Sequence, residues 1–263
     1  MKPFRLVRKP SLLFFVLCLS LVVRSQDRLF VFSFILDEDF PNFIVGRCLE
    51  LDSGLVFKLS DLNQNGNHFE KGVEYLSIYY RPLGISGALK VKDQMTFNLR
   101  GQSYQALVSP PNILVKPLLE PVAEADVALV DTLPAFTAIN LQTKDTLHIS
   151  ENLIKGYDFL YVSVWAHSCR PCIEDMPQFE IFETTFKKRI LFIHLSSERN
   201  IEQALEVLNQ VKPPGIYAVC SESVFSRLNV SGFPRGNLYD KKGKLMRSFS
   251  HITSAFNYLT AHF

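Results

Sequence analysis

The stretch Val164–Asp175, VWAHSCRPCIED, places two cysteines, Cys169 and Cys172, with two residues between them. It follows an apolar run, DFLYVSVWA, that is typical of a buried strand. The residues after it, from Pro171 to Lys188, have apolar side chains at helical spacing. We therefore expect the cysteine pair at the junction of a strand and a helix.

Four interpretations of this cysteine pair compete. Covalent haem attachment needs a histidine directly after the second cysteine, and position 173 holds Ile173. A structural zinc site needs two more ligands, for which only the isolated His167 and His194 are candidates. A purely structural disulfide would close a very small loop and stabilise the fold little. Redox chemistry is the strongest interpretation.

The predicted junction gives the two cysteines different roles. Cys169 would lie beside unpaired backbone N–H groups at the positive end of a helix, and Arg170 adds a nearby positive charge. Both favour the thiolate, which is the species that attacks a disulfide. Pro171 suits the first helical turn, where no amide proton is needed. We expect Cys169 to attack and the more buried Cys172 to resolve the mixed disulfide.

The rest of the chain divides into two regions with different sequence patterns. Residues 26–125 contain short apolar or alternating runs that predict a β-rich N-terminal domain. The stretch KPLLEPVAEADVALVDTLP is typical of a linker or an extended crossing. Residues 126–263 alternate strands with helices and end in a hairpin and a helix, which predicts an α/β sandwich around a mixed sheet.

Size and charge exclude some functions. A chain of 263 residues that is 47% hydrophobic has ample apolar material for packed cores. Its formal charge of +2 is mild, and no basic stripe is interleaved with aromatic residues. We therefore expect no nucleic-acid partner.

The first 25 residues have the pattern of a secretory signal peptide. A basic start precedes the apolar run Leu12–Val23, which is followed by Arg-Ser-Gln-Asp. The run is short for a bilayer, so a membrane anchor is the less favoured alternative. We expect an exported protein, periplasmic or in the cell envelope, where disulfides persist. Cys48 and Cys220 are then expected to be separate buried thiols, with a bridge between the two halves of the chain as the alternative.

Three segments resemble one protein family. VSVWAHSCRPCIEDMP is similar to the active-site segment of thioredoxin-fold proteins, in particular the exported TlpA/ResA branch of thiol-disulfide oxidoreductases. LNVSGFPRGNLYDKKGKL resembles the cis-proline loop and following hairpin of that branch, and LPAFTAINLQTKDTLHI its first hairpin. The resemblance covers roughly residues 128 to 263 and implies a thioredoxin-like C-terminal domain (126–263).

The resemblance implies roles for particular residues. Cys169 is the nucleophile, Cys172 the resolver, and Pro234 a cis-proline that faces them. Phe233, before that proline, offers its backbone to a bound peptide strand. The residues expected to meet the substrate are therefore Phe233, Pro234, Ser168, Arg170 and Pro171.

Two further positions match the exported branch. Asp175 lies where that branch usually has Glu, and Ser163 lies where ordinary thioredoxins keep a buried Asp. Our hypothesis is that Asp175, with a pKa raised by partial burial, moves protons for Cys172. The alternative is a solvated acid near a helix start. Pro177 matches a proline that kinks the active-site helix.

Two departures from the family concern the substrate. Ser168 replaces the Trp that usually precedes the first cysteine, and Arg235 replaces the Thr that commonly follows the cis-proline. The site is therefore expected to be smaller and wetter on one wall, with a substrate preference that the family does not define.

Taken together, these features predict an enzyme, an exported thiol-disulfide oxidoreductase that reduces or exchanges disulfides. Its expected partners are disulfide-bearing envelope proteins and, by resemblance, a membrane thiol-transferring reductant, with no cofactor and no metal. The alternative is a non-catalytic binding module with a quiescent structural disulfide. Peroxide reduction is disfavoured, because it relies on a cysteine in a different setting.

A weaker signal lies in the stretch DLNQNGNHFEKGVE. Asp61, Asn63 and Asn65, with Gly66 at the turn, give the opening pattern of a calcium-binding EF-hand loop. The pattern then fails, because the twelfth position is Gly72 instead of Glu. We expect a polar turn between strands, with calcium as the alternative.

Overall fold

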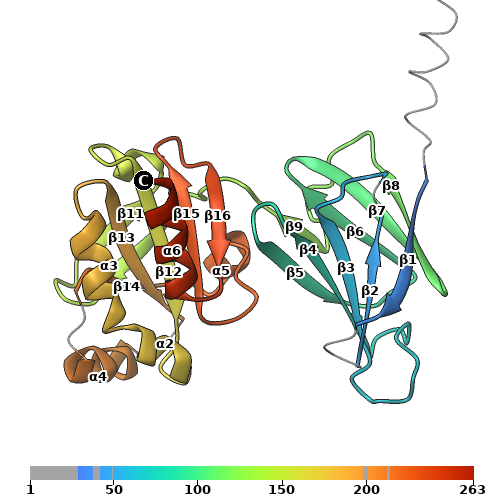
Figure 1. Ribbon diagram of the computed structural model, residues 1–263, viewed down its shortest axis with the longest axis horizontal. Coiled ribbons are helices and arrows are strands. Elements are labelled where there is room, and N and C mark those ends of the chain that lie inside the picture. Colours follow the sequence, from blue (N-terminus) through green and yellow to red (C-terminus); the bar gives the residue numbers. More distant parts are fainter. Residues whose placement is uncertain (1–28, 38–41, 49, 198–200, 212–213) are drawn as a thin grey trace, which may run out of the picture.

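The computed structural model describes residues 29–37, 42–48, 50–197, 201–211 and 214–263. The expected signal peptide, residues 1–25, lies outside this part of the chain. Within the described ranges, no helix combines the length and the apolar character that a membrane crossing requires. Two sheets, one in each half of the chain, organise the molecule and lie side by side (Figure 1).

The strand before the cysteine pair, β12 (Phe159–Trp165), is the central strand of the C-terminal sheet. Its side chains alternate between the two faces, as the two-residue period of a strand requires. Val162 and Val164 point to one face and pack in one apolar cluster, while Tyr161 and Trp165 point to the other. The continuous apolar run is therefore a strand buried on both faces.

Seven strands form this sheet, in the order β11-β10-β14-β13-β12-β15-β16. The pairs β12–β13 and β13–β14 are parallel, and the other pairs are antiparallel. Besides β12, the strands are β10 (Phe136–Asn140), β11 (Thr146–Ile149), β13 (Ile190–Ser196), β14 (Ile216–Cys220), β15 (Arg235–Asp240) and β16 (Leu245–Phe249).

The single helix expected from Pro171 to Lys188 is two helices. The chain forms α2 (Arg170–Asp175) and α3 (Gln178–Phe186), with the break at Pro177. Proline has no N–H to donate, and its ring collides with the carbonyl one turn earlier. The other helices are the short 3-10 turn η1 (Glu151–Ile154), α4 (Ile201–Val211), α5 (Ser223–Arg227) and α6 (Ile252–His262).

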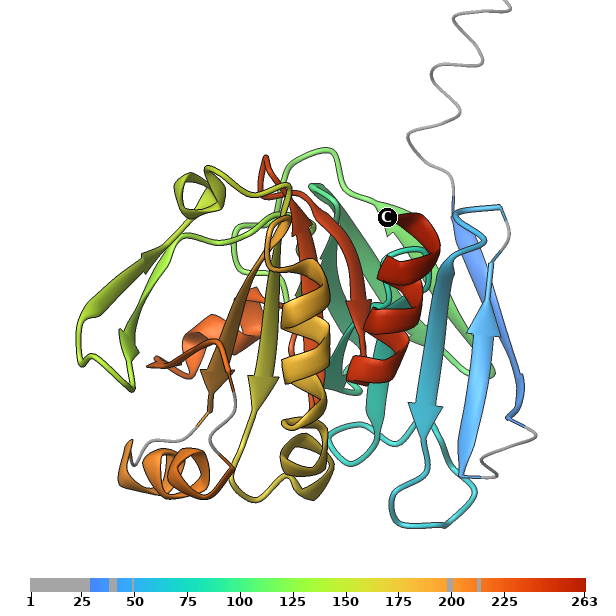
Figure 2. The same cartoon turned by 60° about the vertical axis from the view of Figure 1, so that its left-hand side comes forward.

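The helices cover both faces of the sheet. Helices α3 and α6 lie next to each other on one face (Figure 2). There, Phe182 contacts Tyr161, Phe192 and Phe256. Helix α5 packs on the other face through Val224, Phe225 and Leu228. The sheet is thus the middle layer of an α/β sandwich, as the sequence predicts.

The order of elements is that of a thioredoxin fold. A β-α-β unit, β12 to β13, is followed by a β-β-α unit, β15, β16 and α6, and the three core strands β13, β12 and β15 are neighbours. The additions are α4, β14 and α5 between the two units, and the hairpin β10–β11 before the first. The expected first hairpin and closing hairpin are both confirmed.

The N-terminal half is a sheet of nine strands in the order β5-β4-β3-β2-β1-β8-β7-β6-β9. The β-rich character expected of this half is confirmed. Its last strand reaches residue 129, beyond the expected boundary at 125. The strands are β1 (Phe30–Leu36), β2 (Phe43–Arg47), β3 (Leu55–Ser60), β4 (Tyr75–Tyr80), β5 (Ile85–Lys90), β6 (Gln94–Leu99), β7 (Gln102–Ser109), β8 (Asn112–Pro117) and β9 (Val127–Leu129).

The two halves meet near the start of β15. The backbone N–H of Ser248 donates to the carbonyl of Leu83 at 2.7 Å. The side chain of Asn229 accepts from the N–H of Val130 at 2.8 Å and donates to its carbonyl at 2.6 Å. The buried apolar residues of the first sheet and those on one face of the second form one cluster. The N-terminal half therefore contacts β16 and the segment that leads into β15.

Candidate functional site

The cysteine pair lies where β12 ends and α2 begins. Cys169 is the N-cap of α2, its N–H donates to the carbonyl of Ala166 at 3.1 Å, and Pro171 occupies the first helical turn. The turn exposes Ser168, Arg170 and Pro171 around the pair. Three of the residues expected to meet the substrate therefore form an exposed rim.

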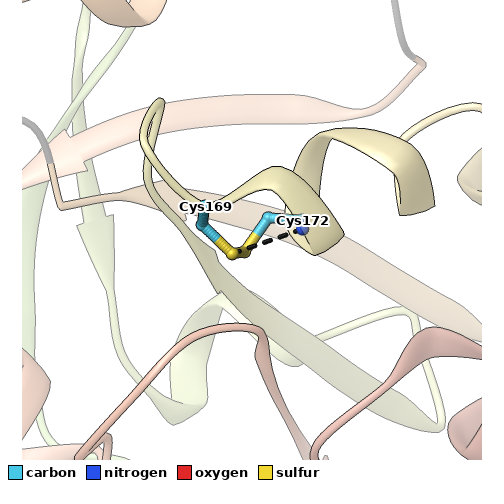
Figure 3. The surroundings of a disulfide bond; sticks show 2 residues. All are labelled: Cys169 and Cys172. Carbon is cyan, nitrogen blue, oxygen red and sulfur yellow. Dashed lines mark hydrogen bonds between the residues drawn. A yellow bond between two sulfur atoms is a disulfide. The ribbon is translucent and has the colours of Figure 1, made fainter.

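The two cysteines form a disulfide, with their Cα atoms 5.3 Å apart (Figure 3). Cys172 is only 3% exposed, whereas Cys169 is partly exposed. The backbone N–H of Cys172 donates to the Sγ of Cys169 at 3.3 Å. Of the two sulfurs, that of Cys169 is the one an outside thiol can reach, and the one that a backbone donor can stabilise as a thiolate.

Arg170 does not direct its charge only at the cysteines. Its Nε donates to Glu174 Oε1 at 2.7 Å, one turn further along α2, and this bond raises the pKa of Arg170. Both side chains are exposed, so the pair is screened by solvent and contributes little to stability. The electrostatic help expected from Arg170 is therefore shared with a carboxylate.

The loop before β15 faces the cysteine pair. The Phe233–Pro234 bond is cis, as the resemblance implies. Strand β15 runs antiparallel to β12 with Arg235 opposite Val164, and this register brings the start of one strand to the end of the other. Pro234 and Cys172 consequently line one cavity. Phe233, 41% exposed, is available at the surface.

Asp175 belongs to the same cavity. Burial raises its pKa above the ordinary 3.8, and a hydrogen bond from the backbone N–H of Ile252, together with the nearby His251, opposes that rise. Asp175 is thus half-buried, close to the start of α6, and lines the cavity that Cys172 also lines. The raised pKa that the proton-transfer hypothesis assumes is present, and the proton transfer itself stays a prediction.

Arg235 is held by the N-terminal sheet. Its Nη2 donates to the Oγ of Ser86 in β5 at 3.3 Å, and Ser86 also contacts Ser231 at 3.3 Å. Burial lowers the pKa of Arg235, and the nearby Tyr79 opposes that effect. Arg235 also lines the cavity with Cys172. A residue of the first half, Ser86, is therefore one contact away from the site.

The cavity behind the disulfide is small and partly polar. Its volume of about 20 Å³ is enough for one water molecule. Trp165 Nε1 and Tyr217 Oη, both from residues that line it, are buried and have no hydrogen-bond partner among the described residues. The wall on the β12 side includes Ser163.

From the sequence, His194 is only an isolated candidate for a zinc ligand. It lies directly opposite Ser163 in the β12–β13 pair, and its ring contacts Ser163 Oγ and Glu183 Oε1. The described residues contain no group of three potential metal-ligating His, Cys, Asp or Glu side chains. A histidine within an otherwise apolar strand, ILFIHLS, was the available signal, because a buried polar group needs partners.

The EF-hand-like stretch forms the expected polar turn. The carboxylate of Asp61 accepts from the N–H groups of Asn65 and Gly66, at 3.1 and 2.9 Å. The side-chain amides of Asn63 and Asn65 donate to Glu70 at 2.9 and 2.7 Å. These bonds account for the turn without an ion.

The other two described cysteines are separate thiols, as expected. Cys48 is buried in the N-terminal half, and Cys220 is half-buried at the end of β14. Burial raises the pKa of Cys220 to about 12, so this thiol forms little of the thiolate that reacts.

No protein-family model matches this chain. No curated protein matches it. Among solved structures, it is similar to the thioredoxin domain of a thiol-disulfide oxidoreductase from Bacteroides vulgatus (21% identity, 51% of this chain, 97% of that chain, TM-score 0.46). It is also similar to a thiol:disulfide interchange protein DsbE from Chlorobium tepidum (19% identity, 52% of this chain, 95% of that chain, TM-score 0.45). A third similar structure is a thiol:disulfide interchange protein from a Bacteroides species (20% identity, 52% of this chain, 90% of that chain, TM-score 0.45).

Proposed function

We propose that this chain is an exported thiol-disulfide oxidoreductase that works through Cys169 and Cys172. The observation that carries the proposal is the contrast between the two sulfurs. Cys169 is partly exposed and accepts a hydrogen bond from a backbone N–H, whereas Cys172 is buried behind it. This is the geometry in which one thiolate attacks from outside and the other resolves.

The proposed exchange moves two electrons from the cysteine pair to a substrate disulfide. In the reduced protein the Cys169 thiolate attacks one sulfur of a substrate disulfide, and the other substrate sulfur leaves as a thiolate that takes up a proton. Cys172 then loses its proton and attacks the Sγ of Cys169. The second substrate sulfur leaves, so two electrons have passed from the cysteines to the substrate.

Two features support a peptide substrate at this site. Phe233 is exposed beside the cis-proline Pro234, and the resemblance implies that its backbone pairs with an extended peptide. Ser168, Arg170 and Pro171 form the opposite, exposed rim. The substrates are disulfide-bearing proteins of the cell envelope, and a membrane thiol-transferring protein returns the electrons.

Asp175 is proposed to accept the proton that Cys172 loses. Its raised pKa places its proton affinity above that of an ordinary carboxyl, and it lines the same cavity as Cys172. Export is supported by the basic and apolar pattern of residues 1–25, which a signal peptidase would remove.

The test is to trap the mixed disulfide. In a Cys172→Ser chain the resolving sulfur is missing, so envelope proteins should accumulate as covalent adducts of Cys169. The adducts should disappear on reduction, and their identification by mass spectrometry names the substrates. The matched control is Cys169→Ser, which keeps the buried thiol but lacks the exposed one.

A non-catalytic binding module gives the opposite result. If the disulfide is a quiescent structural feature, Cys172→Ser yields no more adducts than Cys169→Ser. That outcome would overturn the proposed enzyme.

A further inference from the structure

A buried series of hydrogen bonds leads from the surface to the wall of the cavity. His194 is 0% exposed. Its Nδ1 lies 2.6 Å from Ser163 Oγ, and its Nε2 lies 2.8 Å from Glu183 Oε1. The side chain of Glu183 is 15% exposed, so it reaches solvent, while Ser163 lines the cavity that contains Cys172.

The surrounding residues hold the His194 ring between Ser163 and Glu183. The ring of Tyr217 stacks on it with centroids 4.5 Å apart, and Phe179 contacts it edge-on at 4.3 Å. Gly215 has a φ of +99°, and a Cβ there would stand 2.9 Å from His194 Nε2 and would also meet Glu183 Oε1. The fold thus keeps side chains away from the imidazole–carboxylate contact.

The chemistry of the three groups sets the direction of each hydrogen bond. An ionised carboxylate only accepts, so His194 Nε2 carries a proton toward Glu183. In the neutral ring Nδ1 then accepts the hydroxyl proton of Ser163. When Nδ1 is also protonated it donates to Ser163 Oγ, and the hydroxyl proton is free to point into the cavity. Ser163 is therefore an acceptor toward the cavity in one state and a donor in the other.

One cavity is lined both by Ser163, at the end of this series, and by the resolving Cys172. Ser163 and Cys172 both line it, together with the unpartnered Trp165 Nε1 and Tyr217 Oη. One water fits in its volume of about 20 Å³. A buried water needs two to four polar partners, and the residues that line the cavity carry hydroxyl and indole N–H groups of the required kind.

We propose that Ser163, His194 and Glu183 form a proton relay that serves Cys172. This inference rests on the proposed function. When Cys172 attacks the mixed disulfide, its proton passes through the cavity to Ser163 Oγ, and the Ser163 hydroxyl proton passes to His194 Nδ1. The resulting imidazolium is paired with Glu183. His194 Nε2 then passes its proton to Glu183, and Glu183 releases a proton to solvent, where the departing substrate thiolate takes one up. The reverse transfers restore the starting tautomer of His194 when Cys172 is reduced again.

Other ionisable groups face the same cavity. Asp175, Arg235, His251 and Tyr161 also line it. His194 itself is faced by Glu183 from α3, by Ser163 from β12 and by Tyr217 from β14. Glu183 is the only carboxyl among these three, so it is the group placed to pair with a proton on His194. Asp175 offers a second acceptor, and the relay is a parallel route.

The experiment separates the two sulfur steps. The reduced protein is mixed with 5,5′-dithiobis(2-nitrobenzoate), whose coloured thiol is released once when Cys169 attacks and once when Cys172 resolves. A Cys169→Ser, Cys172→Ser chain gives the background from Cys48 and Cys220. The variants are Ser163→Ala and Glu183→Gln. Their matched controls are Ser248→Ala, a buried serine of the same sheet, and Glu180→Gln, an exposed glutamate of the same helix.

The relay predicts that both variants slow the second release by about tenfold, because positioned proton transfer contributes roughly 10²–10⁴-fold and Asp175 remains as an acceptor. The first release should stay within about twofold of the wild type, which also shows that the fold is intact. The solvent deuterium isotope effect and the pH profile of the second release should change, a result that a structural role would not produce. The controls should match the wild type.

A second release that is unchanged in both variants would overturn the relay while leaving the oxidoreductase in place. If neither release exceeded the background, the proposed function itself would fail. The two failures are therefore distinguishable in one measurement.

Discussion

At the scale of single residues, burial assigns different chemistry to groups of the same type. Cys169 and Cys172 are three positions apart, yet one is partly exposed and the other is 3% exposed. Asp175 and Glu174 are adjacent, yet Glu174 pairs with Arg170 in solvent while Asp175 lines the cavity. The environment, more than the residue type, makes Cys169 the more accessible sulfur and raises the pKa of Asp175.

The pKa of Asp175 predicts a pH dependence of stability. Burial raises that pKa in the folded chain above the ordinary 3.8, so the folded state binds the proton more tightly than the unfolded state. The resulting stability is fully present below pH 3.8 and is lost as the pH rises through the raised value. Asn cannot ionise, so the advantage of Asp175→Asn over the wild type should grow from pH 3.8 upward and then level off.

Urea unfolding of the oxidised protein between about pH 3 and 8 measures this difference. Asp145→Asn, at an exposed position, is the control for the loss of one charge. A constant difference between Asp175→Asn and the wild type across the range would show that Asp175 is not buried in the way described.

At the scale of elements, periodicity predicted most strands, and local chemistry explains the exceptions. The expected helix from Pro171 to Lys188 became two helices because proline interrupts the hydrogen bonds. Strand β5, ISGALK, has no clear alternation of apolar and polar residues, because serine and glycine interrupt the pattern. It is a strand because its backbone pairs with β4. Helix α5 is five residues long, which is too short for a helical period to be recognised.

Helix α3 is held to the sheet chiefly by Phe182. This side chain is 0% exposed and contacts aromatic rings of β12, β13 and α6. Phe182→Ala should lower the free energy of unfolding by about 3–5 kcal/mol, the usual cost of emptying a buried phenylalanine site. The neighbouring Ile181 is 65% exposed, and Ile181→Ala should change stability by less than about 0.5 kcal/mol.

Chemical denaturation of the two variants checks this difference. Equal losses would mean that α3 does not pack through the face that carries Phe182. A large loss at Ile181 would imply that the opposite face of α3 is covered in solution.

At the scale of the whole molecule, contacts between distant segments join the two sheets. Asn229 bonds Val130 across 99 residues, and one apolar cluster contains buried residues of both halves. No local pattern encodes such contacts, so the sequence predicted a β-rich half without predicting that it would border the cis-proline loop. The thioredoxin-like arrangement was predictable because its motifs are local; the placement of Ser86 beside Arg235 was not.

The shared cluster predicts that the two halves unfold together. Trp165, the single tryptophan of the chain, reports on the C-terminal sheet, and the buried Cys48 reports on the N-terminal half. Fluorescence of Trp165 and thiol labelling of Cys48, located by mass spectrometry, should have the same denaturant midpoint. Two separated midpoints would mean that the halves are thermodynamically independent domains.

The central claim is that the sulfur of Cys169 is the outward nucleophile and that of Cys172 the inward one. The most direct measurement is competitive alkylation: the reduced wild-type protein receives a limiting amount of iodoacetamide, is quenched in acid, and is mapped by mass spectrometry. Cys169 should be alkylated at least about tenfold faster than Cys172, because exposure and a stabilised thiolate both raise reactivity. Equal rates, or faster alkylation of Cys172, would contradict the proposed roles of the two cysteines.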